Sequence, residues 1–156
     1  MGDFFKGWRR KTGLVLLVMA LAMAGAWGRS LTMRDEVFFP PRDALHVVAS
    51  SFGTVRWARA SPIPISFEGL TTIRWNSRAF ADDPQGFEKQ DADYYWAQRT
   101  VEWRWGGAGF DFGAGRDEST GMQLERWAIP YWSLVSPLTL VSAYLILWKP
   151  RKRATP

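Results

Sequence analysis

The longest charge-free stretch of this chain, WAIPYWSLVSPLTLVSAYLILW at residues 127–148, limits what the chain can fold into. It contains 22 residues between Arg126 and the basic run KPRKR at 149–153. A helix of that length measures roughly 33 Å, which is enough to cross a hydrocarbon core of about 30 Å. The sequence therefore predicts a transmembrane helix over residues 128–148, followed by a basic tail over 149–156.

The positive charge of the chain is concentrated beside its apolar segments. The net charge is +5, but residues 1–28 carry +3, residues 128–156 carry +4, and residues 29–127 carry −2. A nucleic-acid-binding domain carries its excess cations on its folded surface, so this distribution argues against a nucleic-acid partner. Lysine and arginine beside membrane segments mark the cytoplasmic side. We therefore expect cytoplasmic tails at 1–11 and 149–156, and an exported, periplasmic or otherwise extracytoplasmic domain at 29–127.

The first apolar segment, residues 12–28, has two interpretations. Its 17 uncharged residues give roughly 26 Å as a helix, which is at the short end for a membrane span. One interpretation is a cleaved signal peptide covering about residues 1–26, with small-residue cleavage sites at 22–24 or 24–26. The favoured interpretation is an uncleaved first span, in which Ala20, Ala24 and Gly28 form a small-residue helix-packing face.

Residues 29–127 show short alternating runs and no long helical period, which predicts β-strands joined by turns. The candidate strands cover 31–39, 44–50, 53–60, 70–76, 94–105, 110–112 and 122–127. Six or seven such strands predict a small antiparallel domain folded as a sandwich or an open barrel. The predicted fold class is thus a membrane protein in which two transmembrane helices flank a mainly antiparallel β-domain.

The final span contains two prolines and a row of hydroxyl side chains. Pro130 falls where the first helical turn tolerates proline, and Pro137 falls in the interior, where proline bends a helix. Hydroxyl residues recur every three positions and form the predicted partner of the small face of the first span: Ser133, Ser136, Thr139 and Ser142. Aromatic residues suited to anchoring the two spans at the membrane interfaces are Trp8, Trp27, Trp127, Tyr131, Trp132, Tyr144 and Trp148.

The C-terminal part of the chain resembles a group of small uncharacterised bacterial, planctomycete-like membrane proteins with two spans. The resemblance covers residues 105–153, from the Gly-Phe and Met-x-Leu strands through IPYWSLVSPLTLVSAYLILWKPRKR. In those proteins a short exported β-region leads through a (V/I)PYW segment into a last span that ends in a basic tail. The resemblance implies the same in–out–in arrangement, and it implies no activity, catalytic residue or ligand.

Residues that carry most enzyme chemistry are scarce in this chain. There is no cysteine, which excludes disulfides, thiolate catalysis and cysteine-ligated metals. His46 is the single histidine and has no nucleophile elbow beside it, so we interpret it as a half-buried or surface strand residue. The glycine-rich stretches at 106–109 and 113–115 lack the GxGxxG spacing, and we interpret them as turns. We expect no catalytic residue, no cofactor and no enzyme activity.

An acidic segment is the most suggestive polar feature. Carboxylates at short spacing can hold calcium, and residues 91–102 place acids at positions 1, 3 and 12 of an EF-hand-like loop. Trp96 stands at position 6, where the sharp turn requires glycine, so a solvated acidic loop without a metal is the favoured interpretation. The alternative is a ligand loop whose residues are Asp82, Asp83, Glu88, Asp91 and Asp93.

Aromatic residues are dense in the predicted strand 94–105. They are Tyr94, Tyr95, Trp96, Trp103 and Trp105. Alternation with polar residues favours packing in the domain core. The alternative role is a stacking platform for carbohydrate or peptide.

The sequence predicts a membrane-anchored, non-enzymatic accessory or interaction protein that presents a small β-domain outside the cytoplasmic membrane. Its expected partners are the lipid bilayer and a membrane or envelope protein. The alternative is an envelope ligand-binding or sensing domain that uses the acidic segment 82–93 and nearby aromatic residues. The tails, together about 19 residues, are too short for a signalling domain of their own, since domains run to 50 residues or more.

Overall fold

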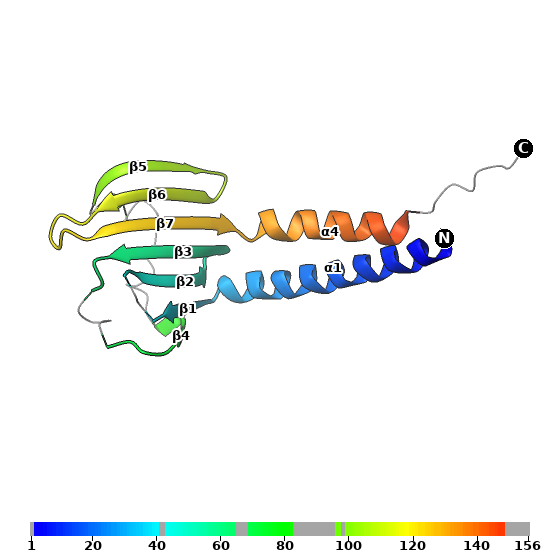
Figure 1. Cartoon of the computed structure of the whole chain (residues 1–156), viewed down its shortest axis with the longest axis horizontal. Coiled ribbons are helices and arrows are strands. Elements are labelled where there is room, and N and C mark those ends of the chain that lie inside the picture. The colour runs from blue at the N-terminus through cyan, green and yellow to red at the C-terminus, as the bar shows by residue number, and fades with distance from the viewer. Residues whose placement is uncertain (1, 41–42, 65–68, 83–95, 98, 149–156) are drawn as a thin grey trace, which may run out of the picture. The chain divides into compact units, whose positions relative to one another are not determined.

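The protein is described by a computed structural model (Figure 1), which covers residues 2–40, 43–64, 69–82, 96–97 and 99–148. The chain divides into two compact units. One unit combines Met1–Gly25 with Trp132–Pro156, and the other is Ala26–Tyr131. The first unit is helical and the second is built around a β-sheet.

The helical unit contains most of helix α1 (Gly2–Ser30) and the whole of helix α4 (Trp132–Leu147). Within α1, the segment Trp8–Ser30 has 23 residues and a mean hydropathy of 1.5, which is long and apolar enough to cross a membrane. Helix α4 is apolar but has only 16 residues. The two helices pack closely at Gly13, whose carbonyl oxygen accepts a hydrogen bond of 2.8 Å from the buried hydroxyl of Ser142.

The predicted helix over 128–148 starts too early in the sequence. Residues 128–130 belong to a β-strand, and the helix starts at Trp132. Pro130 still pairs with Thr54 of the neighbouring strand, and the amide of Tyr131 donates to the carbonyl oxygen of Gly53 at 2.9 Å. Amides alternate in direction along a strand, so the missing donor of Pro130 faces the side on which the sheet pairing has already ended. The charge-free run at residues 127–148 therefore covers the end of strand β7 and then helix α4.

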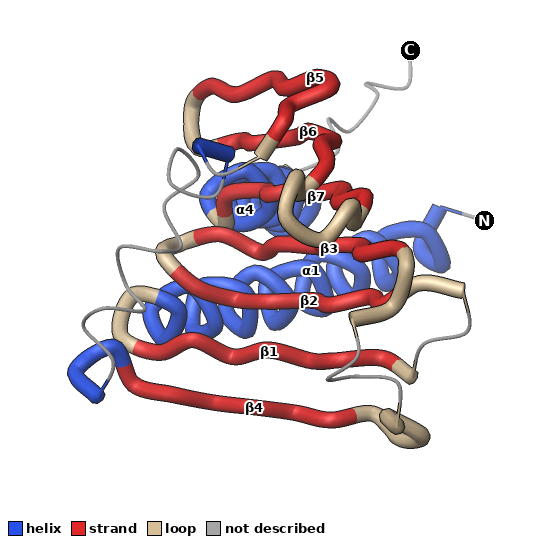
Figure 2. Tube along the Cα trace, turned by 90° about the vertical axis from the view of Figure 1, so that its left-hand side faces the viewer, coloured by secondary structure: helices blue, strands red, loops and turns tan. Residues whose placement is uncertain are grey.

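Seven antiparallel strands form one sheet in the described part of the Ala26–Tyr131 unit. They are β1 (Met33–Phe39), β2 (Leu45–Ser51), β3 (Thr54–Ser61), β4 (Arg74–Ala79), β5 (Thr100–Gly107), β6 (Phe110–Arg116) and β7 (Gln123–Pro130). Their order across the sheet is β4-β1-β2-β3-β7-β6-β5 (Figure 2). The central strand is therefore β3, and β4 and β5 form the two edges.

The prediction of a mainly antiparallel β-domain is confirmed, and its strands form a single open sheet rather than the two sheets of a sandwich. Two tight turns connect neighbouring strands, at Phe52-Gly53 and at Ala108-Gly109, and all four residues have positive φ. This conformation matches the twist of a two-residue hairpin. The two hairpin groups then join edge to edge through the β3–β7 pair rather than stacking face to face. Alternation along each strand does not distinguish these two arrangements, because both give one inner and one outer face.

Candidate functional site

The register of the sheet sorts its side chains onto two faces. Directly paired residues of an antiparallel sheet point to the same side. Ala128 pairs with both Arg56 and Asp111, so these residues share one face, which we call the arginine face. Trp57 pairs with Trp127 on the opposite side, which we call the aromatic face.

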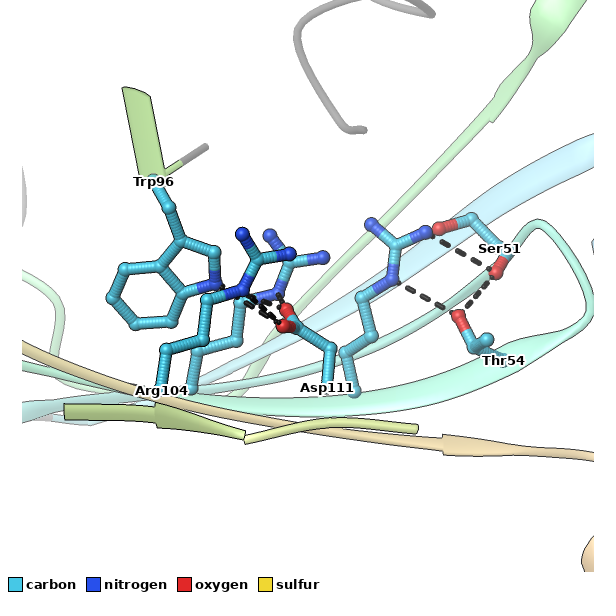
Figure 3. Close-up of polar contacts among 7 residues, drawn as sticks. Ser51, Thr54, Trp96, Arg104 and Asp111 are labelled. Carbon is cyan, nitrogen blue, oxygen red and sulfur yellow. Dashed lines mark hydrogen bonds and ion pairs between the residues drawn. The ribbon is translucent and has the colours of Figure 1, made fainter. Parts of the chain in front are cut away.

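A buried aspartate organises the arginine face (Figure 3). Asp111 is 5% exposed, and its carboxylate oxygens lie 2.9 Å from Nε of Arg104 and 3.4 Å from Nε of Arg126. The indole Nε1 of Trp96 donates to the same two oxygens at 3.3 and 3.1 Å. Arg126 is also 5% exposed. This carboxylate is therefore held out of water by charged and hydrogen-bonding partners, which offset its desolvation.

Two glycines of β6 make room for Trp96. A Cβ at Gly113 would lie 2.7 Å from Cζ2 of the Trp96 ring, and one at Gly115 would lie 3.3 Å from Cζ3. Trp96 itself is 3% exposed and belongs to a helical turn at 96–97. The interpretation of residues 113–115 as a turn is therefore wrong, since these glycines lie within a strand and accommodate an indole ring.

Arg56 connects the arginine face to the β2–β3 turn. Its Nε donates to the hydroxyl of Thr54 at 3.0 Å, and its NH2 group donates to the carbonyl oxygen of Ser51 at 3.4 Å (Figure 3). Burial, together with the positive charges of Arg126 and Arg34, lowers the pKa of Arg56 to about 10. The guanidinium therefore remains charged at neutral pH and stabilises the turn.

An apolar row crosses all seven strands of the aromatic face. In the order of the strands, successive pairs of the register are formed by Trp75, Val37, Val48, Trp57, Trp127, Phe112 and Trp105. The exposed fractions are 69% for Trp75, 48% for Trp127 and 57% for Trp105. Exposed apolar patches larger than a few hundred Å² mark interaction sites on soluble domains. This row is therefore the candidate functional site.

The rings at the centre of the row stand edge to face. The Trp127 ring lies at 88° to that of Trp57 and at 84° to that of Phe112, with centroids 6.1 and 5.6 Å apart. Beside them is an open hollow of about 370 Å³ lined by Val55, Trp57, Trp127 and Ile129. The surface is therefore corrugated rather than flat, and it suits side chains that interdigitate with it.

Several predicted roles of aromatic residues are corrected by this arrangement. Trp103 and Trp105 were expected in the core, but they are 49% and 57% exposed. Trp127 was expected to anchor a membrane span, but it lies in β7 within the apolar row. Tyr94 and Tyr95 lie outside the described residues. Asp111 and Arg126 on the arginine face are buried, whereas several tryptophans of the aromatic face are exposed, the reverse of the usual preference.

Both ends of the Ala26–Tyr131 unit are tied to the β2–β3 turn. The amide of Phe52 donates to the carbonyl oxygen of Ser30 at 2.8 Å, and the amide of Gly53 donates to the Ser30 hydroxyl at 3.1 Å. Tyr131 bonds the same turn through Gly53, and its hydroxyl lies 2.8 Å from that of Ser50. The chain therefore enters and leaves the sheet at the same end of its central strands.

The acidic candidates are mostly outside the described residues. Asp82 ends the short 3-10 helix Phe80–Asp82 and is exposed, and the others, Asp83, Glu88, Asp91 and Asp93, are not described. In the part of the chain that the structure describes, no three acidic or histidine side chains are grouped as a metal site would require. His46 is half-buried on β2, with its ring centroid 5.7 Å from that of Trp57.

The residues of the predicted helix-packing face lie in different surroundings. Ala20 is 2% exposed, Ala24 and Ser133 are half-buried, and Ser136 and Thr139 are exposed. A Cβ at Gly28 would meet no atom within 4 Å. At Gly13, in contrast, a Cβ would lie 2.8 Å from Cγ1 of Ile146. The close contact at Gly13 therefore lies nearer the N-terminus of α1 than the predicted face.

Comparison with protein-family models, with curated proteins and with solved structures gave no match to this chain. The resemblance of residues 105–153 to small bacterial two-span membrane proteins thus stays a prediction.

Proposed function

We propose that this chain is a membrane-anchored, non-enzymatic interaction protein that presents its β-sheet outside the cytoplasmic membrane and binds a protein partner through the aromatic face. The observation that carries this proposal is the apolar row that crosses all seven strands, in which Trp75, Trp105 and Trp127 are about half exposed or more. Burying one such aromatic side chain at an interface removes roughly 150–250 Å² of surface from water, which makes tryptophan a strong anchor for association.

The exposed surface of the helical unit supports the membrane anchor. Large apolar side chains point outward from both helices: Leu14, Val15, Val18 and Leu21 of α1, and Leu140, Val141 and Leu147 of α4, with exposed fractions from 47% to 76%. Exposing such a surface to lipid costs no hydration free energy, because lipid tails are as apolar as the side chains. Helix α4 alone measures roughly 24 Å, which a bilayer accommodates by local thinning and by basic flanking residues that reach the interface.

The orientation in this proposal follows from charge. Basic residues lie before the apolar part of α1 and after α4, and this asymmetry favours cytoplasmic ends. The chain between the helices begins and ends at the same turn of the sheet, through Ser30 and Tyr131. One bilayer can therefore hold both connections on the same side.

The test of location uses the absence of cysteine, which removes background labelling. Ala81→Cys introduces a thiol at an exposed position after β4, and Ala154→Cys introduces one in the C-terminal tail. In cells with a permeabilised outer barrier, we expect a membrane-impermeant maleimide to label the first variant, and the second only after lysis. Labelling in the opposite order would overturn the proposal.

The test of binding compares two exposed apolar positions. Trp105→Ser removes a member of the row, whereas Ile73→Ser removes a side chain that is 62% exposed and outside the strands. We expect the first change to weaken chemical cross-linking to the protein partner in membranes by at least tenfold and the second to leave it unchanged. Equal yields for both variants would show that the aromatic face does not bind.

A further inference from the structure

We propose that the partner bound by the aromatic face is a second copy of this chain. The two sheets pack face to face, and each strand runs in the same direction as the equivalent strand of the other copy. This inference rests on the proposed function, because it takes both copies to be anchored in one membrane. Its two-fold axis runs along the central strand β3. The size of the face, the shapes of its side chains and the position of the chain ends each support it.

The size of the aromatic face matches that of a stable interface. Seven strands at about 4.8 Å spacing, each about seven residues long at about 3.3 Å per residue, form a surface of roughly 800 Å². A specific protein complex of standard size buries about 800 Å² on each partner. Two such faces would therefore form an interface of the size that specific recognition requires, without any further surface.

The orientation of the rings favours a sheet over a flat ligand. A sugar ring stacks through the C–H groups of one of its faces on aromatic rings that lie open and parallel to the sheet. Here Trp127 stands at 88° to Trp57 and at 84° to Phe112, so the central rings present edges as well as faces. Stacked sheets lie about 10 Å apart, and side chains from their inner faces interdigitate, which is the contact that upright rings can make.

The apolar row is complementary to itself. Next to β3 it contains the small residues Val48 and Val37 on one side and the large residues Trp127 and Phe112 on the other, and its two ends are Trp75 and Trp105. A two-fold axis along β3 reverses the strand order of the second copy. It therefore places Trp127 of the second copy over Val48, and Phe112 of the second copy over Val37. Large side chains then meet small ones on both sides of β3, while Trp57 meets Trp57 of the second copy at the axis and Trp75 meets Trp105 of the second copy at the edges.

The chain ends select the direction of packing. Ser30 and Tyr131 are both tied to the β2–β3 turn, so the two connections to the helices leave the sheet at one end of its central strands. Two copies in one bilayer must turn this end to the same side. A two-fold axis along the strands does so, whereas an axis across the strands places the two ends on opposite sides. The permitted axis brings Val55, on β3, close to Val55 of the second copy.

The decisive experiment introduces charges at this self-paired position in the full chain. The oligomeric state is measured in detergent by sedimentation and light scattering for wild type, Val55→Arg, Val55→Asp and an equal mixture of the two variants. We expect a dimer for wild type, at least tenfold weaker association for each variant alone because like charges meet at the axis, and recovery in the mixture. The same substitutions at Ala81, exposed and outside the strands, are the matched control and should leave the dimer intact.

A second variant separates shape from hydrophobicity. Val48→Trp adds apolar surface but fills the space that Trp127 of the second copy occupies. We expect it to weaken the dimer at least tenfold, whereas a face that binds lipid or an unrelated protein would bind at least as well. Circular dichroism and the thermal unfolding midpoint confirm that each variant is folded.

Three outcomes would overturn the dimer: a monomeric wild type at all concentrations, dimers that persist in both Val55 variants, or a mixture that does not recover. If Ala81→Cys is labelled from outside and Trp105→Ser abolishes cross-linking to a different protein, the proposed function survives and this inference fails. If Ala81→Cys is labelled only after lysis, the proposed function fails regardless of the oligomeric state.

Discussion

The indole nitrogen of Trp96 lies 3.1 Å from a carboxylate oxygen of Asp111, and both side chains are almost fully buried. This bond spans 15 residues of sequence and holds the ring over β6. Because Arg104 and Arg126 contact the same carboxylate, one aspartate connects three side chains from separate elements. The cluster around Asp111 thus stabilises the sheet on the side opposite the aromatic face.

Gly113→Ala tests the space under Trp96. Its new Cβ would lie 2.7 Å from the indole ring and 2.9 Å from the carbonyl oxygen of Trp103, so the ring must shift. We expect the free energy of unfolding to fall by about 1–3 kcal/mol, as in other overpacked sites. Gly107→Ala is the control, because no atom lies within 4 Å of its Cβ, and it should stay within about 0.5 kcal/mol of wild type. Denaturant titration of the full chain measures both.

Asp111→Ala tests the buried ion pair. It removes the carboxylate that Arg104 and Arg126 approach at 2.9 and 3.4 Å, which leaves buried cations less well compensated. We expect a loss of about 3–5 kcal/mol of stability. Glu125→Ala removes a partner of Arg59 at 3.3 Å, but that pair is partly exposed and should contribute only about 0–1 kcal/mol. Similar losses for the two variants would contradict a structural role of the buried carboxylate.

The ion pair of Asp35 with Arg29 should make the free energy of unfolding depend on pH. Hydrogen bonds of 2.7 and 3.1 Å from Arg29 lower the pKa of the Asp35 carboxyl below its usual value. A lowered folded-state pKa adds stability above the unfolded value of about 3.9, and this contribution is lost as the pH falls through the folded pKa. We expect Asp35→Asn to be less stable than wild type near neutral pH and nearly equal to it in strong acid. A difference in unfolding free energy that does not vary with pH would contradict this linkage.

Gly13→Val tests the helical contact. The new side chain would collide with Ile146, whose Cγ1 lies 2.8 Å from the position of the added Cβ, and would strain the bond between Ser142 and the Gly13 carbonyl. A cost of about 1–3 kcal/mol should lower the Tm in detergent by about 2–10 °C. Adding Ile146→Ala should restore part of the loss. Gly25→Val, whose Cβ meets no atom within 4 Å, should leave the Tm unchanged.

The alternation of residues along the chain was enough to locate the strands. The predicted strands at 31–39, 44–50 and 53–60 overlap β1, β2 and β3. The strand beginning at 94 was predicted too early, because Trp96 is in a helical turn and β5 starts at Thr100. A tryptophan suits both a strand and a buried turn, so local pattern could not separate them.

The arginine face was missed although its signal is present in the sequence. Arg56 and Arg104 each lie between aromatic or apolar neighbours in a strand, and Arg126 precedes Trp127, which indicates a charged face. Polar faces of antiparallel sheets are usually solvated. The arginine face differs because the fold brings Trp96 and Arg126 to the carboxylate of Asp111 on β6. No spacing along the chain encodes that meeting.

By itself, the sequence determined the apolar helices, the strands and the positive charge at both ends, because each depends on neighbouring residues and on periodicity. The tertiary structure alone decided that β7 continues to Pro130, that the strands form one open sheet, and which face of that sheet is buried. These outcomes depend on pairing between distant segments. A strand keeps the same alternation of residues whether the domain has one sheet or two, and whichever of its faces is buried. Only the assembled sheet therefore shows that tryptophans of the apolar row are exposed.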